Sequence, residues 1–151
     1  MKLKIYFFGK PNEITDWEQK HIQRIGYRAQ IEVVALAQAG LRDSAKNKAK
    51  EAESLLKKID AQDFVIALDE HGKDLTSVQF SQKLKTALVD HGTVVLIVGG
   101  AYGLDASILS RANLKLAFGQ AVWTRNLVRL MLLEQLYRAL EIDGGGNFHK
   151  A

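Results

Sequence analysis

The sequence predicts a single α/β domain over residues 1–151, in which a mostly parallel sheet is flanked by helices. Apolar runs that suit strands alternate with helical patterns along the chain, in the order βαβαβαβαβα. Two of these runs, 64–68 and 93–98, are continuous rather than alternating, as strands are when helices cover both faces of their sheet. The chain contains no linker or internal repeat that would indicate a second domain.

The first two strand–helix pairs are expected in residues 1–59. A strand over 2–8 ends at a loop that holds the only proline, and Thr15 or Asp16 caps the helix that follows. The second strand covers 31–37, and Ser44 begins the second helix. That helix should bury the residues that recur every three or four positions, namely Ala45, Ala49, Ala52, Leu56 and Ile59.

Three more pairs are expected in the rest of the chain. The strands cover 64–68, 93–98 and 114–118, the first of them followed by a turn at 69–73. Thr76 or Ser77 caps a helix that Gly92 ends, and a short helix covers about 105–112. Thr124 caps a long last helix that runs to about residue 142, where a glycine-rich stretch ends it.

Composition limits the class of protein. An apolar fraction of 47% and a charged fraction of 25% are typical of a globular chain, and the absence of cysteine excludes a disulfide framework, a zinc ribbon and a thiol nucleophile. The longest apolar runs have five residues, far fewer than the ~20 that cross a bilayer, and the N-terminus lacks a secretion signal. We therefore expect a cytoplasmic protein without a membrane segment.

The charge of the chain is uneven. The net charge is +4, and residues 1–58 carry twelve basic and seven acidic side chains. The basic residues that dominate this part are Lys46, Lys48, Lys50, Lys57 and Lys58. They are either a solvated helix face or a surface for a polyanion such as RNA, and the charge alone favours the former.

Glycines follow three of the predicted strands, in the segments 68–72, 99–103 and from 119 onward. Ligands of open parallel sheets bind beyond the carboxyl ends of the strands, and glycine lets a ligand approach the backbone. These strand ends therefore predict a pocket. The chain has no dinucleotide fingerprint after its first strand, no phosphate-binding loop and no nucleophile elbow, and its four histidines are too far apart in sequence to form a metal motif.

The last helix is apolar almost all round over 127–140, so it should be buried on more than one side. A domain of this size rarely surrounds such a helix, which favours a homodimer. Glu134 and Arg138 are four residues apart and can form an ion pair along the helix. Arg129 does not face Glu134, so it is expected to be freer to meet a ligand or a partner chain.

Two stretches together resemble a known family. They are 94–104, VVLIVGGAYGL, and the segments LVR at 127–129 and EQLYRA at 134–139. They are similar to the bacterial SPOUT-class methyltransferase family that methylates N3 of a pseudouridine in 23S rRNA. The resemblance covers the whole chain, including LDEHGK at 68–73. It implies a C-terminal trefoil knot, which topological rules alone would make improbable. It further implies S-adenosylmethionine as cofactor, a homodimer, and 23S rRNA of the assembled ribosome as substrate, with no metal.

The resemblance also implies positions for the site. By position, the cofactor is expected to contact residues at the three glycine-bearing strand ends, namely Leu68, Gly99, Gly100, Gly119, Gln120, Ala121, Val122, Trp123 and Thr124. The expected catalytic residues are His149, as the base for the acceptor nitrogen, and Arg129, as a cation that offsets negative charge. In a dimer, the tail of one chain can complete the pocket of the other.

The chain departs from the family pattern at two places. Thr124-Arg125-Asn126 stands where the family has Pro-His, and Asn147-Phe148-His149-Lys150 stands where its tail reads Pro-Tyr-His-Arg. These departures motivate one alternative, a catalytically inactive ribosome- or RNA-binding homologue. A second alternative is a flavodoxin-like nucleotide-binding domain without an RNA partner.

Overall fold

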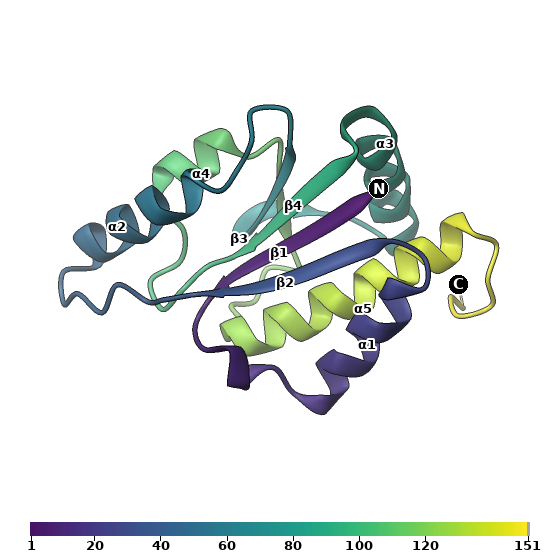
Figure 1. The fold of residues 1–151 in the computed structure, drawn as a ribbon, viewed down its shortest axis with the longest axis horizontal. Helices are drawn as coiled ribbons and strands as arrows, with labels where there is room; N and C mark the ends of the chain where they lie inside the picture. The colour runs from purple at the N-terminus through teal and green to yellow at the C-terminus, as the bar shows by residue number, and fades with distance from the viewer. Residues whose placement is uncertain (151) are drawn as a thin grey trace.

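The computed structural model describes residues 1–150, which form one five-stranded sheet with helices on both faces (Figure 1). The strands are β1 (Lys2–Phe8), β2 (Gln30–Leu36), β3 (Phe64–Asp74), β4 (Thr93–Val98) and β5 (Leu114–Ala117). The helices are η1 (Pro11–Glu13, 3-10), α1 (Asp16–Gly26), α2 (Ser44–Leu56), α3 (Ser77–His91), α4 (Ala106–Arg111) and α5 (Arg125–Asp143). The strand order is β2-β1-β4-β3-β5, and every neighbouring pair is parallel. The predicted fold class is confirmed.

Two hydrophobic cores lie on the two faces of the sheet. Helices α1, α3 and α5 cover one face, and α2 and α4 cover the other (Figure 1). Alternate residues of β4 enter each core: Val94 and Leu96 pack with the first group of helices, and Val95 and Ile97 with the second. This two-sided burial explains why the sequence of β4 is continuously apolar. Within residues 1–150, no helix is both long and apolar enough to span a bilayer.

The buried face of α2 differs from the prediction. Ala45 and Ala49 are exposed, whereas Asn47 and Glu51 are buried. Asn47 accepts a hydrogen bond from the backbone N–H of Leu41 at 2.9 Å, and Glu51 accepts one from a second N–H of the same loop at 3.2 Å. The helix therefore turns a polar edge inward, because the loop before it has backbone donors that need acceptors.

Strand β3 is longer than predicted and changes register within the expected turn 69–73. Its residues Leu68 and Lys73 both pair with Leu116 of β5, so the four residues between them form an irregular excursion. Gly72 lies directly on the backbone of β5: a Cβ at this position would be 2.6 Å from the carbonyl carbon of Lys115. Only a residue without a side chain fits this crossing.

Replacing Gly72 with alanine should therefore destabilise the fold. We expect the free energy of unfolding to fall by about 2–3 kcal/mol and the melting temperature by about 5–10 °C, because the methyl group meets backbone atoms that cannot rotate away. Thermal and urea unfolding measure this. Gly26→Ala is the matched control, since nothing lies within 4 Å of its added Cβ. An unchanged stability of the Gly72 variant would contradict the close contact.

Candidate functional site

The carboxyl ends of β3, β4 and β5 meet at a cavity of about 490 Å³. Its walls come from all three glycine-bearing segments and from the start of α5. Of the nine predicted cofactor contacts, seven line this cavity: Leu68, Gly99, Gly100, Gly119, Ala121, Val122 and Trp123. The structure thus confirms the prediction that the three glycine-bearing strand ends meet at one pocket. The volume of this cavity lies in the range of small-molecule sites, ~300–1,000 Å³.

The other two predicted contacts are placed differently. Gln120 is exposed and outside the cavity lining, and Thr124 occupies the N-cap position of α5 without a side-chain capping bond. The lining also includes residues that were not predicted to contact the cofactor. Among them are Lys48 of α2, which is distant in sequence, and Tyr102. The position of Tyr102 between Gly100 and Gly103, which bridge across a tight turn, is a signal that could have found it.

The two glycines directly after β4 have little room for a side chain. A Cβ on Gly99 would lie 3.0 Å from the carbonyl carbon of Gly103, and a Cβ on Gly100 would lie 3.0 Å from Oε1 of the buried Glu51. Gly103 has a φ of 82°, which favours glycine. These constraints leave bare backbone on the cavity wall, where N–H and C=O groups can contact a ligand.

Two aromatic side chains lie at the cavity with about half of their surface exposed. Tyr102 is 48% exposed at the turn tip, and Trp123 is 45% exposed. The indole N–H of Trp123 donates to the carbonyl oxygen of Phe118 at 2.9 Å, which fixes the orientation of the ring. Exposed aromatic rings at a cavity are surfaces on which a planar ligand can stack.

Arg125, the first residue of α5, brings a positive charge to the cavity. Its guanidinium forms an ion pair with Glu13 at 3.3 Å. The side-chain oxygen of Gln38 accepts a further hydrogen bond from it when the amide is oriented to satisfy both groups. Arg125 therefore stands, anchored by the segment after β1, at a place where the family pattern has Pro-His.

Arg129 is buried, and the expectation that it is free to meet a ligand or a partner is wrong. Its side chain is 1% exposed and forms an ion pair and hydrogen bonds with Glu18 of α1. The guanidinium also lies over the ring of Phe7 at 4.3 Å. Glu18 is also the N3 residue of the capping box that Thr15 begins, so its carboxylate both caps α1 and pairs with Arg129.

The protonation state of Glu18 follows from these contacts. Burial raises the pKa of Glu18, but the hydrogen bonds from Arg129 and Thr15 and the charge of Arg129 outweigh it, so that the pKa lies below its usual value. The carboxylate is therefore ionised in the folded protein and holds α1 against α5. Arg129 performs this structural role whatever its part in catalysis.

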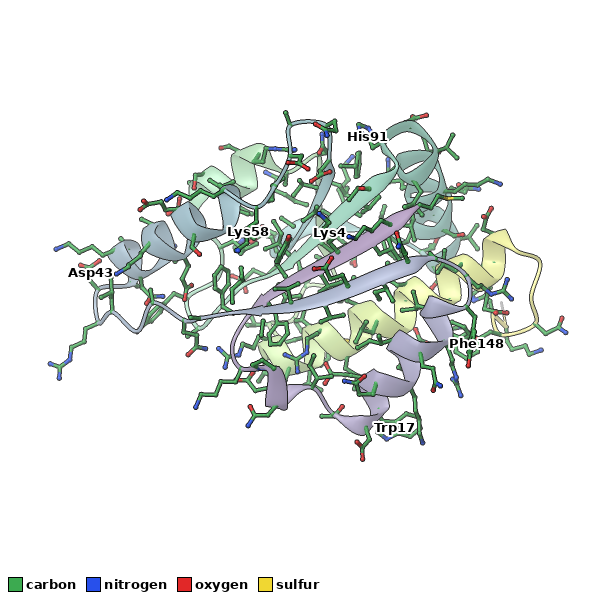
Figure 2. The ribbon with its side chains drawn as sticks, viewed as in Figure 1. Lys4, Trp17, Asp43, Lys58, His91 and Phe148 are labelled. Atoms are coloured by element: carbon green, nitrogen blue, oxygen red, sulfur yellow. The ribbon has the colours of Figure 1, made fainter. Side chains whose placement is uncertain are left out.

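His149 lies at the other end of α5 from the cavity. Its Nδ1 is 3.2 Å from a guanidinium nitrogen of Arg138, which forms the predicted ion pair with Glu134. Phe148 packs edge-on against Tyr137, and Figure 2 places it beside the C-terminal half of α5. His149 does not line the cavity of its own chain: its contact Arg138 lies ten residues, or about 15 Å, further along α5 than Val128, which does line it.

A second cavity, of about 570 Å³, lies along α5 between α1 and α3. Leu130, Met131 and the 64%-exposed Trp17 contribute to its apolar lining. His21 also lines it, and the Nδ1 of this histidine is buried without a hydrogen-bond partner. Burial and the nearby Arg24 lower the pKa of His21, although Glu134 opposes them. The apolar face of α5 is thus only partly covered within one chain.

Comparison with known proteins gives full-length matches. The family model described as "Predicted SPOUT methyltransferase" matches residues 1–149. Ribosomal RNA large subunit methyltransferase H of Streptococcus equi subsp. zooepidemicus is 38% identical over 99% of this chain and 100% of that protein. The proteins of the same name from Streptococcus suis and Leuconostoc mesenteroides are 35% identical over the same shares.

Among solved structures, the SpoU methyltransferase AviRb from Streptomyces viridochromogenes, in complex with AdoMet, aligns with a TM-score of 0.48 and 12% sequence identity. The alignment covers 97% of this chain and 61% of the AviRb chain, so this chain spans about three fifths of that one.

Proposed function

The chain belongs to the SPOUT methyltransferase family, and we propose that it transfers a methyl group from S-adenosylmethionine to N3 of a pseudouridine in 23S rRNA. The observation that carries this proposal is the cavity at the ends of β3, β4 and β5, which lies in the part of the chain where the family motifs are found. The names of the full-length relatives supply the substrate class, ribosomal RNA of the large subunit.

The residues of the cavity fit this cofactor. Bare backbone at Gly99 and Gly100 offers hydrogen-bonding groups to an adenine or ribose, and the apolar residues Leu68 and Val122 can pack against the adenine ring. Asp69 lies in the same lining and is a carboxylate acceptor for hydroxyl groups. When bound, S-adenosylmethionine supplies a methyl group on a sulfonium sulfur, which needs neither a metal nor a covalent bond to the protein.

The acceptor nitrogen must lose a proton. N3 of a uracil ring is protonated at neutral pH, so its N–H bond breaks as the new N–CH₃ bond forms, and a base takes the proton. We assign this role to His149, because a neutral imidazole nitrogen can accept a proton. The cation that offsets negative charge on the uracil ring is assigned to Arg125, which lines the cavity. Arg129 acts as a positioning residue between α1 and α5.

A homodimer follows from this assignment. Since His149 does not line the cavity of its own chain, the tail that completes the site belongs to a second copy. The apolar cavity formed by Trp17, Leu130 and Met131 supports the contact, because a second copy would cover this face of α5.

The trefoil knot that the family implies is also part of the proposal. Leu116 pairs with residues on both sides of the excursion 69–72, and Gly72 crosses the backbone of β5. This crossing supports a C-terminal segment that passes beneath an arch of the chain.

The reaction can be tested on ribosomal RNA. Ribosomes from a strain that lacks the corresponding methyltransferase are incubated with the protein and S-adenosylmethionine, and the nucleosides are analysed by mass spectrometry. We expect one N3-methylated pseudouridine to appear. Cofactor binding by calorimetry without any methylation would instead support the inactive RNA-binding homologue, which the substitutions at Thr124 and Phe148 motivate. Absence of cofactor binding would overturn the assignment of the cavity.

A further inference from the structure

A third cavity, of about 670 Å³, forms a groove between α3 and the outer strand β5. It runs from the N-terminal ends of β3 and β5, near His91 at the end of α3, to the excursion 69–72 (Figure 2 labels His91). His71 lines both this groove and the cavity assigned to the cofactor. The groove therefore borders the cavity assigned to the cofactor.

The charges of the groove are mostly positive. Lys73, Lys83 and Lys115 line it, all three are exposed, and among residues 1–150 none of them forms an ion pair. Asp90 is the one acid of the lining, and Glu70 lies next to the shared His71 at 3.8 Å. Lysines that lack acidic neighbours in the fold are available to an anionic partner.

The rest of the lining combines apolar residues with neutral polar side chains. Gln79, Gln82 and Thr86 lie on one face of α3, three to four residues apart, on the same side as Lys83. Asn113, which precedes β5, also lines the groove, and its side-chain oxygen accepts a hydrogen bond from a backbone N–H of β3 at 2.8 Å. Amide and hydroxyl groups combined with lysine are the side chains that contact phosphate and sugar oxygens of nucleic acids, whereas an apolar partner would leave these groups unpaired.

We propose that this groove binds the sugar–phosphate backbone of the RNA that carries the acceptor nucleotide. The inference rests on the proposed function and adds the path of the substrate: the strand lies along α3 and β5, and passes His71 to reach the cavity. The inference places the RNA on the lysines of this groove. It does not place the RNA on the lysines of residues 46–58, which dominate the charge of the sequence but do not line the groove.

The test measures binding to 70S ribosomes from a strain that lacks the methyltransferase, by filtration at several salt concentrations. The variant replaces Lys73, Lys83 and Lys115 with alanine. We expect its Kd to rise on the order of 100-fold near 0.1 M salt, at about fivefold per lysine, and the slope of log K against log salt to become shallower by about 3. The matched control replaces Lys50, Lys57 and Lys58 with alanine, which removes the same charge, and should change the Kd less than threefold.

Three readouts keep the outcomes distinct. Calorimetry with S-adenosylmethionine should give the same affinity for wild type and both variants, which shows that the cofactor cavity is intact. The single variant Lys83→Glu, at an exposed position of α3, should weaken ribosome binding at least fivefold. It repeats the test with one substitution in place of three. Equal effects of the two triple variants, or wild-type affinity of the groove variants, would overturn the inference. Wild-type protein that binds ribosomes through the groove but methylates nothing would instead overturn the proposed function.

Discussion

Replacing Glu18 with glutamine should lower the free energy of unfolding by about 3 kcal/mol and the melting temperature by roughly 10 °C. The variant keeps the shape of the side chain and its capacity to cap α1, but it removes the negative charge. The guanidinium of Arg129, which is 1% exposed, would then be left in the protein interior without a charged partner of similar burial. Glu13 does not replace Glu18, because its carboxylate lies 4.0 Å from Arg129 and is also paired with Arg125.

Urea unfolding of matched variants measures this effect. Glu53→Gln removes one partner of an exposed ion pair, that of Lys57, and should cost less than about 0.5 kcal/mol. The double variant Glu18→Leu with Arg129→Met should be more stable than either single change, because it removes both buried charges together. A Glu18→Gln variant as stable as the Glu53→Gln control would show that the buried pair does not hold α1 against α5.

The ion pair between Glu18 and Arg129 also determines how the stability of the protein changes at acid pH. The pKa of Glu18 is lowered in the folded protein, so its contribution is fully present above the unfolded value of about 4.3. The contribution is lost as the pH falls through the lower folded value. Wild-type stability should therefore decline more steeply than that of Glu18→Gln below about pH 4.5, and the two curves should converge in acid.

Replacing His149 with alanine should lower the rate of methylation by about 10²–10⁴-fold, the range that a positioned base contributes. The affinity for S-adenosylmethionine should not change, because the residues assigned to cofactor binding line the cavity and His149 is not among them. Single-turnover methylation of ribosomes measures the rate, and calorimetry measures the affinity. Lys150→Ala, the neighbouring exposed position, serves as control and should keep most of the activity.

A mixed dimer shows whether the C-terminal tail completes the cavity of its own chain or the cavity of its partner. One copy carries His149→Ala, and the other carries Gly100→Val, whose side chain would collide with Glu51 and obstruct the cavity. If the tail acts across the dimer, the intact cavity receives an intact tail and activity returns to about half of the wild type. If His149→Ala retains full turnover, the histidine has no part in the reaction.

The elements that local sequence determines were predicted closely. The bounds of β1 and β4 agree with the structure, and α3 begins after its Thr76 cap and ends at Gly92. The meeting of three glycine-bearing strand ends was also predictable, because parallel strands place their carboxyl ends on one edge of the sheet. These features depend on periodicity, capping and chain direction, which can be read without knowing the tertiary contacts.

The features that sequence reasoning missed depend on contacts between distant segments. Arg129 looked unpaired within its helix, but its partner Glu18 is 111 residues earlier in the chain. Asn47 and Glu51 are buried because a loop outside α2 needs acceptors, which helical periodicity does not reveal. Lys48 enters the cavity from another layer of the fold, and the extension of β3 to Asp74 requires the presence of β5.

The order of the strands has a consequence for synthesis of the chain. Strand β1 lies between β2 and β4, so the edge of β1 that pairs with β4 stays unpaired until residue 98 has been synthesised. The carboxylate of Glu18 in α1 gains its charged partner only after Arg129 has been synthesised. Contacts this distant in sequence slow folding. We therefore expect the N-terminal half to lack its full set of native contacts until the final helix has been synthesised.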